Sequence, residues 1–203
     1  YRNPAFDVQM IGFDVPHHVY APIIGSDIVR TSKNDFYVLE DNCRIPSGVS
    51  YMIENREIMM RMFPDIFQQM KVESVDNYPQ HLLNTLMSLK PKNCYGEPNV
   101  VLLTPGPLNS AYYEHTYLAD TMGIELVQGN DLYVEDGITY MMTTVGPKKI
   151  DVIYRRIDDK FLDPLSFDNS SLIGIPGLFD SYKSQNLTIA SAPGSGIADD
   201  KAI

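Results

Sequence analysis

One stretch near the middle of the chain constrains the fold more than any other part of the sequence. Residues 100–103 form a short apolar run, Val-Val-Leu-Leu, that suits a strand buried on both faces. A Thr-Pro-Gly-Pro loop follows, and then a predicted helix over residues 108–122 that Gly123 can close with a left-handed cap. Residues 124–127 are the next predicted strand. This β-α-β order predicts two neighbouring parallel strands joined by a right-handed crossover.

The rest of the second half extends this pattern. Residues 151–154 and 187–190 are two further apolar runs of strand length, and an Asp-Gly turn predicts an inserted hairpin over residues 131–142. We therefore expect residues 99–203 to form an α/β region with a Rossmann-like layer.

A different organisation is expected in residues 1–98, before the Gly-Glu-Pro break at 96–98. Two β-rich runs flank a polar turn and predict a β-hairpin over residues 23–42. The helices expected after it span residues 49–62, 64–70 and 78–89. Methionines recur at helical spacing in the first of these helices, which indicates a stripe that faces the core.

Composition excludes several classes of protein. The net charge of −10 argues against a nucleic-acid-binding protein, whose surface carries excess Lys and Arg. No run of 18 apolar residues is present, so we expect no membrane-spanning helix. Only two cysteines occur, without CxxC spacing, which argues against a disulfide framework or a zinc site. The chain starts at Tyr1, and we expect it to be a fragment of a larger protein.

The predicted hairpin carries an oxygen-rich set of side chains. Glu40, Asn42 and Arg44 fall on one face if the second strand extends that far, because strand side chains alternate. Asp27 lies on the partner strand. Two carboxylates and an amide oxygen suit Mg²⁺, which takes its remaining ligands from water and phosphate oxygens. A solvated polar face of a hairpin is the alternative interpretation.

A second candidate site lies where the predicted strand at 100–103 meets its helix. Asn109 and Ser110 open that helix, and a helix N-terminus at the carboxyl edge of a parallel sheet favours a carboxylate or phosphate. The loop matches neither a dinucleotide-binding GxGxxG pattern nor a Walker A loop. Alternatively, Asn109 or Ser110 serves only as a helix cap.

Two neighbouring arginines follow the strand at 151–154. Arg155 and Arg156 suit an anionic substrate, because a guanidinium group can bind a carboxylate or phosphate through two hydrogen bonds. In the alternative interpretation they pair with Asp158, Asp159 or Asp163 in a structural network. A further pair, Glu114-His115, lies on the helix after the loop, where the histidine is either a general base or a packed side chain.

Taken together, these segments resemble the circularly permuted ATP-grasp type 2 family, which includes relatives of glutathionylspermidine synthase and glutathione synthetase. The segments that carry the resemblance are Gly-Ser-Asp-Ile-Val-Arg at 25–30, Leu-Glu-Asp-Asn at 39–42, Arg-Ile-Pro-Ser-Gly-Val-Ser-Tyr at 44–51, Leu-Thr-Pro-Gly at 103–106, Asn-Ser-Ala-Tyr-Tyr-Glu-His at 109–115, Tyr-Arg-Arg-Ile-Asp-Asp at 154–159 and Gly-Ile-Ala-Asp-Asp-Lys at 196–201.

The resemblance implies a fold and a chemistry. Residues 1–98 would be a partial ATP-grasp region with the hairpin and helices, and residues 99–203 the Rossmann-like pre-ATP-grasp region. The implied enzyme is a carboxylate–amine ligase that uses ATP and Mg²⁺ to form an amide through an acyl phosphate. Its partners would be small-molecule or peptide substrates rather than nucleic acid or membrane, and its location cytoplasmic.

The resemblance also implies roles for particular residues. Asp27, Glu40 and Asn42 would hold Mg²⁺ against the ATP phosphates, while Arg30 and Arg44 would help to hold phosphate or acyl phosphate.

The loop residues and the arginine pair would face the carboxylate substrate; these are Asn109, Ser110, Arg155 and Arg156. The lid that clamps ATP would follow Lys201, so we expect this fragment alone to be inactive. Two other interpretations are a catalytically silent ATP-grasp relative that acts as a binding or scaffold module, and a plain α/β module that binds a sugar or an amino acid.

Overall fold

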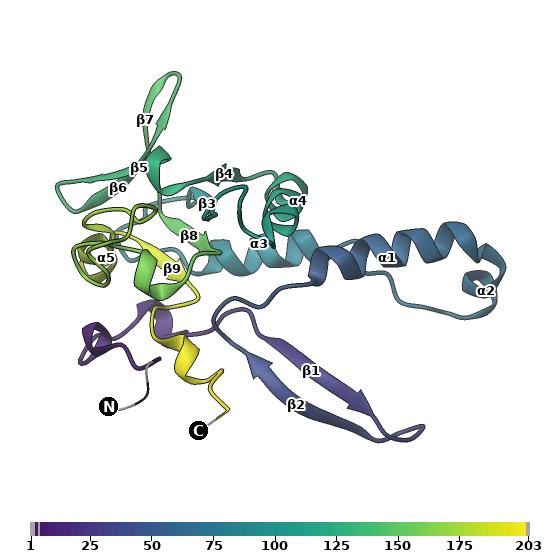
Figure 1. Ribbon diagram of the computed structural model, residues 1–203. Helices are drawn as coiled ribbons and strands as arrows, with labels where there is room; N and C mark the ends of the chain where they lie inside the picture. Colours follow the sequence, from purple (N-terminus) through teal and green to yellow (C-terminus); the bar gives the residue numbers. More distant parts are fainter. Residues whose placement is uncertain (1–2, 4, 202–203) are drawn as a thin grey trace.

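A four-stranded parallel sheet forms the centre of the computed structural model, which describes residue 3 and residues 5–201 (Figure 1). Its strands are β3 (Val100–Leu103), β4 (Glu125–Val127), β8 (Val152–Arg155) and β9 (Thr188–Ala190). They lie in the order β4-β3-β8-β9, and every neighbouring pair runs parallel. The four predicted strands are confirmed to within one residue at each end.

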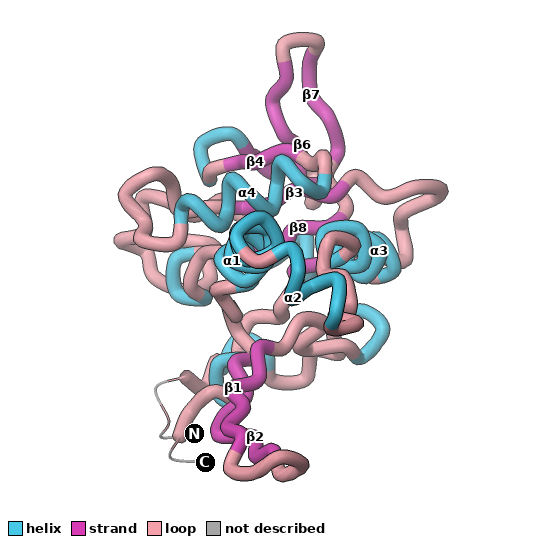
Figure 2. Tube along the Cα trace, turned by 90° about the vertical axis from the view of Figure 1, so that its right-hand side faces the viewer, coloured by secondary structure: helices cyan, strands magenta, loops and turns pink. Residues whose placement is uncertain are grey.

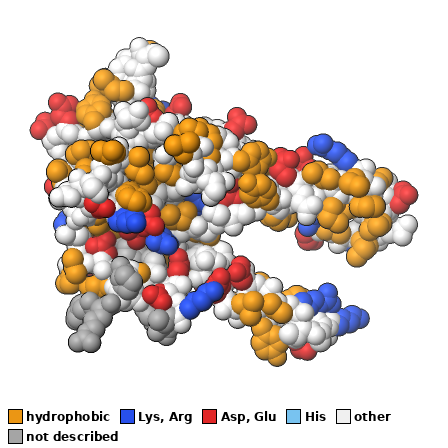
Figure 3. Space-filling view, in the orientation of Figure 1, with side chains coloured by type: hydrophobic (Ala, Val, Ile, Leu, Met, Phe, Trp, Pro, Cys, Tyr) orange, Lys and Arg blue, Asp and Glu red, His pale blue; other side chains and the backbone are white. Residues whose placement is uncertain are grey.

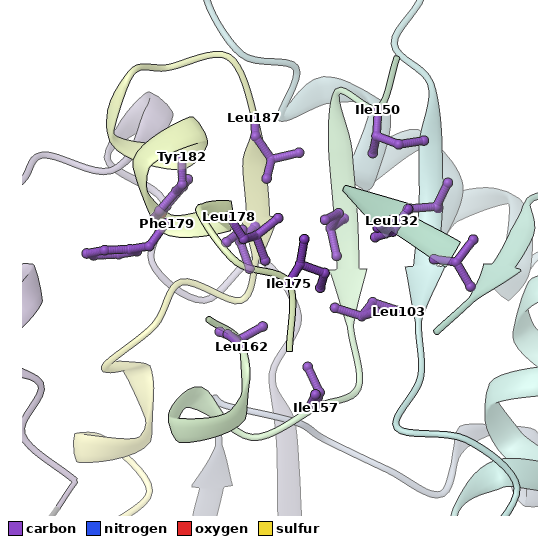
Figure 4. Close-up of a cluster of buried hydrophobic side chains, with 14 of the residues drawn as sticks. Leu103, Leu132, Ile150, Ile157, Leu162, Ile175, Leu178, Phe179, Tyr182 and Leu187 are labelled. Atoms are coloured by element: carbon purple, nitrogen blue, oxygen red, sulfur yellow. The ribbon is translucent and has the colours of Figure 1, made fainter. Parts of the chain in front are cut away.

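Both faces of this sheet are buried, as the apolar run at 100–103 predicted. Val101 and Leu103 pack into one core cluster, while Val100 and Leu102 pack into a second cluster on the opposite face. Figure 4 shows the first cluster, in which Leu103 lies with side chains from the small helix α5 (Leu178–Lys183) and from the connecting loops. A strand buried on both faces has no room for polar side chains, which explains its uniform composition.

Helices cover the sheet on both sides. The second cluster contains apolar side chains of α3 (Tyr78–Ser88) and α4 (Tyr112–Met122), which also contact each other. The first contains side chains of α5 (Leu178–Lys183). The division at residue 98 stays a prediction, although α3 packs against the sheet of the second region.

One helix start differs from the sequence prediction, and one helix was not predicted. The helix expected from residue 108 starts at Tyr112, and Gly123 ends it with a φ of 68°, the left-handed cap that was predicted. The helix α5 was not predicted, because six residues are too few to show a helical period. The short 3₁₀ helices are Val8–Met10, Pro16–His18, Gly129–Asp131, Asp159–Phe161 and Ser195–Ile197.

A second, antiparallel sheet is inserted between β4 and β8. It consists of β5 (Leu132–Glu135), β6 (Ile138–Thr143) and β7 (Gly146–Lys149), and the β6–β7 hairpin extends away from the rest of the molecule (Figure 2). The predicted hairpin at 131–142 is confirmed. Strand β7 was not predicted because it contains Gly146, Pro147 and two lysines, a composition that is tolerated only at a sheet edge.

Two arms project from this body. The hairpin arm consists of β1 (Gly25–Arg30) and β2 (Phe36–Asn42), and the helical arm consists of α1 (Val49–Met62) and α2 (Pro64–Gln69). They extend side by side in the same direction, and the space-filling view shows an open groove between them (Figure 3). Among the residues that the structure describes, no helix combines the length and apolar character needed to cross a membrane.

The methionine stripe of α1 does not face a core, contrary to the sequence prediction. Met52, Met59 and Met62 are all exposed, and the helix buries only Ser50 and Ile53. Helical spacing alone cannot show whether another element covers the stripe.

Candidate functional site

The strand order places a switch point between β3 and β8. The chain leaves β3 to form β4 on one side, and later returns to add β8 on the other side. Ligands of open parallel sheets bind at the carboxyl edge beside such a point. Here β3 ends at Leu103 and β8 ends at Arg155, so the predicted loop and the arginine pair meet at this edge.

A buried ion pair lies beside this switch point. The Arg156 guanidinium donates to a Glu114 carboxylate oxygen at 2.9 Å, and both side chains are almost fully buried. Arg156 also donates to the Pro46 carbonyl at 2.6 Å and to the Ser47 hydroxyl at 2.6 Å. The second candidate arginine therefore binds the linker between the two arms.

The other oxygen of the Glu114 carboxylate caps the helical arm. It accepts hydrogen bonds from the Gly48 N–H at 2.7 Å, the Ser50 N–H at 3.2 Å and the Ser50 hydroxyl at 3.0 Å. These groups lie at the N-terminus of α1, where free N–H groups and the positive end of the helix dipole favour a carboxylate. Glu114 was considered from the sequence only as a neighbour of His115, because the partners that define its role are more than 40 residues away.

His115 is a packed side chain at the start of α4. Its Nδ1 lies 2.8 Å from the Thr104 hydroxyl, and the imidazole is buried. Burial, with a smaller contribution from the Arg156 charge, lowers the pKa of His115 to about 4. The ring is neutral at neutral pH, which fits the packed interpretation.

Arg155 is fully buried and bonded to the interior of the body. It donates to the backbone carbonyls of Ser191 and Ile157 at 2.6 and 2.9 Å, and it pairs with Asp159 at 2.6 Å. Burial lowers the pKa of Arg155. Arg155 thus matches the alternative interpretation, a structural network, through Asp159, whereas Arg156 is in such a network with Glu114 and with none of the three predicted aspartates. The predicted member Asp163 instead accepts from backbone N–H groups, including that of Phe179.

Asn109 and Ser110 lie in the loop before α4 rather than at its first turn. The Asn109 side-chain oxygen accepts from the Ala111 N–H at 2.9 Å, which shapes the loop. The helix cap position is Ala111, and no side chain caps it. Ser110 is exposed to solvent. The structure therefore places these two residues near the switch point, with Ser110 open to solvent.

The hairpin arm brings two predicted metal ligands together. Asp27 and Glu40 are directly opposite each other on β1 and β2, and the register shifts beyond them so that Ile28 pairs with Val38. Leu39 is the extra residue of this β-bulge. The Glu40 carboxylate also accepts from the Lys201 ammonium at 2.7 Å, and this contact lowers the pKa of Glu40. The two opposed carboxylates therefore lie near one positively charged side chain, that of Lys201.

The remaining predicted ligand lies two residues further along β2. Asn42 pairs with Gly25, and its side-chain nitrogen donates to the Gly25 carbonyl at 3.3 Å. In the described part of the chain, no group of three His, Cys, Asp or Glu side chains is arranged to hold a metal ion. The predicted ligands of the metal ion are therefore two carboxylates and one amide. Such an all-oxygen set fits Mg²⁺, which keeps several water or phosphate ligands.

The two predicted phosphate-binding arginines lie at opposite ends of the hairpin. Arg30 is next to the turn at the tip, where its guanidinium donates to the carbonyls of Ser32 and Lys33. Arg44 follows β2 and pairs with Asp158 at 3.1 Å. The structure brings Arg44, but not Arg30, to the carboxyl edge of the sheet.

A pocket of about 550 Å³ opens beside Arg44. Asp158, Lys160 and Asp168 line one part of it, and the segment around Asp7 lines the other. Sequence reasoning missed this pocket, because residues 5–9 carry no motif and lie far along the chain from Asp158. Lys201 was likewise missed as a partner of Glu40, although it belongs to one of the segments that carried the family resemblance.

Comparison with known proteins places these features in a family. The model of the family described as "Circularly permuted ATP-grasp type 2" matches residues 1–203, the whole chain. An uncharacterized protein of Synechocystis is 50% identical over 193 residues, which cover 95% of this chain and 40% of that protein. An uncharacterized protein of Mycobacterium tuberculosis is 48% identical over 98% of this chain and 36% of its own length. The chain thus spans 40% and 36% of the lengths of these two curated relatives.

A more distant relative carries an enzyme name. A protein of Frankia alni named "Putative glutamate--cysteine ligase 2-3" is 36% identical over 88% of this chain and 21% of its own length. The family match extends over every element described above, from the 3₁₀ helix Val8–Met10 to the 3₁₀ helix Ser195–Ile197. The chain belongs to the circularly permuted ATP-grasp type 2 family.

Proposed function

We propose that the full-length protein is an ATP- and Mg²⁺-dependent ligase that joins a carboxylate to an amine through an acyl phosphate. The observation that carries this proposal is the opposed pair Asp27 and Glu40 on the hairpin of an ATP-grasp family member. Two relatives of this chain from Frankia species have names that include "glutamate--cysteine ligase", and these names support the reaction class. The acid and the amine are small molecules or peptides in this proposal, as in a glutathionylspermidine synthase-like enzyme.

The reaction balances in two steps. A carboxylate oxygen of the acid attacks the γ-phosphorus of ATP, and ADP leaves with the electrons of the broken P–O bond. The amine nitrogen then attacks the acyl carbon, inorganic phosphate leaves, and the nitrogen loses a proton to give the amide. Mg²⁺ bound at the hairpin would neutralise negative charge on the phosphoryl group during its transfer.

The positions of the chain's own residues indicate what each of them would bind. Asp27, Glu40 and Asn42 would hold Mg²⁺, since they share one part of the exposed hairpin. Arg44 would bind phosphate or acyl phosphate, because it lies between the hairpin and the 550 Å³ pocket. Asn109 and Ser110 would contact the acid at the switch point. Arg155 and Arg156 instead fix the backbone around that edge.

The domain division is part of the same proposal. Residues 1–98 would supply the partial ATP-grasp region, and residues 99–203 the Rossmann-like pre-ATP-grasp region. The fragment alone would be inactive, because the elements that enclose ATP would lie outside it.

The test follows release of ADP by the full-length protein with Mg-ATP and pools of acids and amines. Release that requires both an acid and an amine, and that Glu40→Gln abolishes, is the expected result. Asp41→Asn is the matched control, because Asp41 is an exposed carboxylate on the same strand that pairs with Ser26 instead. Nucleotide binding without release over the complete substrate pools would instead support the silent relative, and equal loss in both variants would contradict the assigned metal site.

A further inference from the structure

Both arms expose apolar side chains at positions where folded proteins normally bury them. On the hairpin arm these include Ile28, Phe36 and Val38, and on the helical arm Met59, Met62 and Ile66. Contiguous exposed apolar surface of this kind marks an interaction site. The arms lie side by side and extend in the same direction, so one partner can contact both (Figure 3).

The register of the hairpin places an apolar pair and an acidic pair on opposite faces, and the face with Ile28 and Val38 is called the apolar hairpin face. Ile28 is opposite Val38, and directly opposed residues of an antiparallel pair share a face. Asp27 and Glu40 form the adjacent pair, so their side chains point to the other face. The apolar hairpin face can therefore be covered while the two carboxylates stay accessible on the opposite face.

The hairpin also lacks the neighbours that a stable sheet needs. β1 and β2 pair only with each other, and their outer edges carry no further strand in the described structure. An isolated two-stranded hairpin is marginally stable in water, and free edges attract further strands. The helical arm also has little packing around it, because α1 buries only Ser50 and Ile53.

We propose that the part of the full-length polypeptide outside residues 1–203 packs against both arms, covering the apolar hairpin face and the exposed apolar surface of α1 and α2. The Synechocystis relative supports this occupant, because about 60% of its length lies outside the match to this chain. That length is enough for a further core that would bury these side chains. Methionine adapts its shape to such an interface. The inference does not depend on ligase activity.

The test is methionine oxidation in the full-length protein without nucleotide, read by peptide mass spectrometry. Met62 and Met142 form a matched pair, because they are 64% and 63% exposed and lie on different parts of the molecule. Hydrogen peroxide oxidises methionines according to their access to solvent. Met62 is expected to oxidise at least about tenfold more slowly than Met142, since burial limits that access. Equal rates would overturn the proposal.

Dilution separates this occupant from a second copy of the protein. Protection of Met62 that persists at all concentrations, in a particle whose mass in light scattering is that of one chain, supports the proposal. Protection that disappears on dilution together with a dimer would assign the surface to a second copy and overturn it. If Met62 is oxidised rapidly without nucleotide and becomes protected only when Mg-ATP is added, the nucleotide covers this surface, and the proposal is overturned.

A pair of substitutions gives an independent reading in the full-length protein. Val38→Asp places a charge on the apolar hairpin face and is expected to lower the Tm, whereas Val145→Asp, at an exposed turn between β6 and β7, leaves it unchanged. Equal Tm values for both variants and the parent protein would contradict a covered hairpin. Neither readout uses catalysis, so a failure of the ligase proposal would leave both results interpretable.

Discussion

The body of this molecule buries the side chains of its central strands, whereas the two arms leave most of their side chains exposed. Every residue of β3 and β8 is buried, and the apolar side chains of these strands divide between two core clusters. The strands of the hairpin arm are exposed over nearly their whole length. The body is thus stabilised by its own packing, whereas the hairpin arm gains little stability from burial within the described chain.

The difference also separates the charged groups by role. Charges inside the body, such as Arg156 and Glu114, are paired and bonded to the backbone, and they fix geometry. Charges on the hairpin arm, such as Asp27 and Glu40, are opposed on an open surface and are available to a cation. The location of a charge, more than its type, distinguishes structural residues from candidate functional ones.

The largest expected effect comes from breaking the buried pair that joins the arms to the body. Arg156→Met leaves the Glu114 carboxylate buried without its partner, which costs about 3–5 kcal/mol of stability. Denaturant unfolding measures this loss. Arg61→Met is the control, because Arg61 forms an exposed pair with Glu57 within α1 and its replacement changes stability by less than about 0.5 kcal/mol.

A double variant sharpens that result. Arg156→Met combined with Glu114→Gln removes the unpaired charge, so it is expected to recover part of the lost stability. A double variant as unstable as the sum of both single variants would show that the two side chains act independently.

A truncation in the core tests the body alone. Leu103→Ala removes a fully buried side chain and is expected to destabilise the protein by about 2–5 kcal/mol. Leu172→Ala changes the same residue type at an exposed position and is expected to cost less than about 0.5 kcal/mol. Comparable losses of unfolding free energy in the two variants, measured by urea unfolding, would contradict the conclusion that Leu103 lies in a packed core and Leu172 on an uncovered surface.

His115 makes the stability of the body depend on pH. Its pKa is about 4 in the folded protein and 6.5 in the unfolded chain, so the unfolded state binds more protons between these values. Stability is therefore lost as the pH falls from about 6.5 through about 4, by up to about 3 kcal/mol. Unfolding curves across this range are expected to show a smaller pH dependence for His115→Gln than for the parent. His81→Gln, at an exposed position, is expected to retain the parent's slope.

The smallest effect is expected on the hairpin arm. Lys201→Ala removes the exposed ammonium bound to Glu40, and because such surface pairs contribute little, no change in Tm is expected. The same variant leaves the two opposed carboxylates without a competing cation. Calorimetry with Mn²⁺ on the full-length protein is therefore expected to show tighter binding than the parent, and weaker binding would contradict a shared site.

Local sequence patterns predicted much of the body. The apolar run at 100–103, the capping Gly123 and the Asp-Gly turn each determine a local conformation, so their strand, helix end and hairpin were found. Strand β7 and helix α5 were missed because one contains glycine and proline and the other is short. The start of α4 was misplaced by four residues, because Asn109 shapes a loop where a first helical turn was expected.

The candidate site was predicted less completely, and the reason lies in its long-range contacts. Asp27 and Glu40 were proposed from a single hairpin, in which the partners lie close along the chain. The roles of Arg156 and Glu114 depend on Pro46, Ser47 and Gly48, which no spacing rule connects to them. The pocket beside Arg44 likewise joins residues 5–9 to the end of β8.

The sequence by itself determined the family, the parallel strands and the identity of the oxygen-rich hairpin, because motifs and periodicity are local properties of a chain. Only the tertiary structure decided that Arg155 and Arg156 are internal and that the methionines of α1 are exposed. It also decided that a bulge at Leu39 places Asp27 opposite Glu40. Burial and register depend on which distant segments pack together, and a one-residue shift reverses the face of every later side chain.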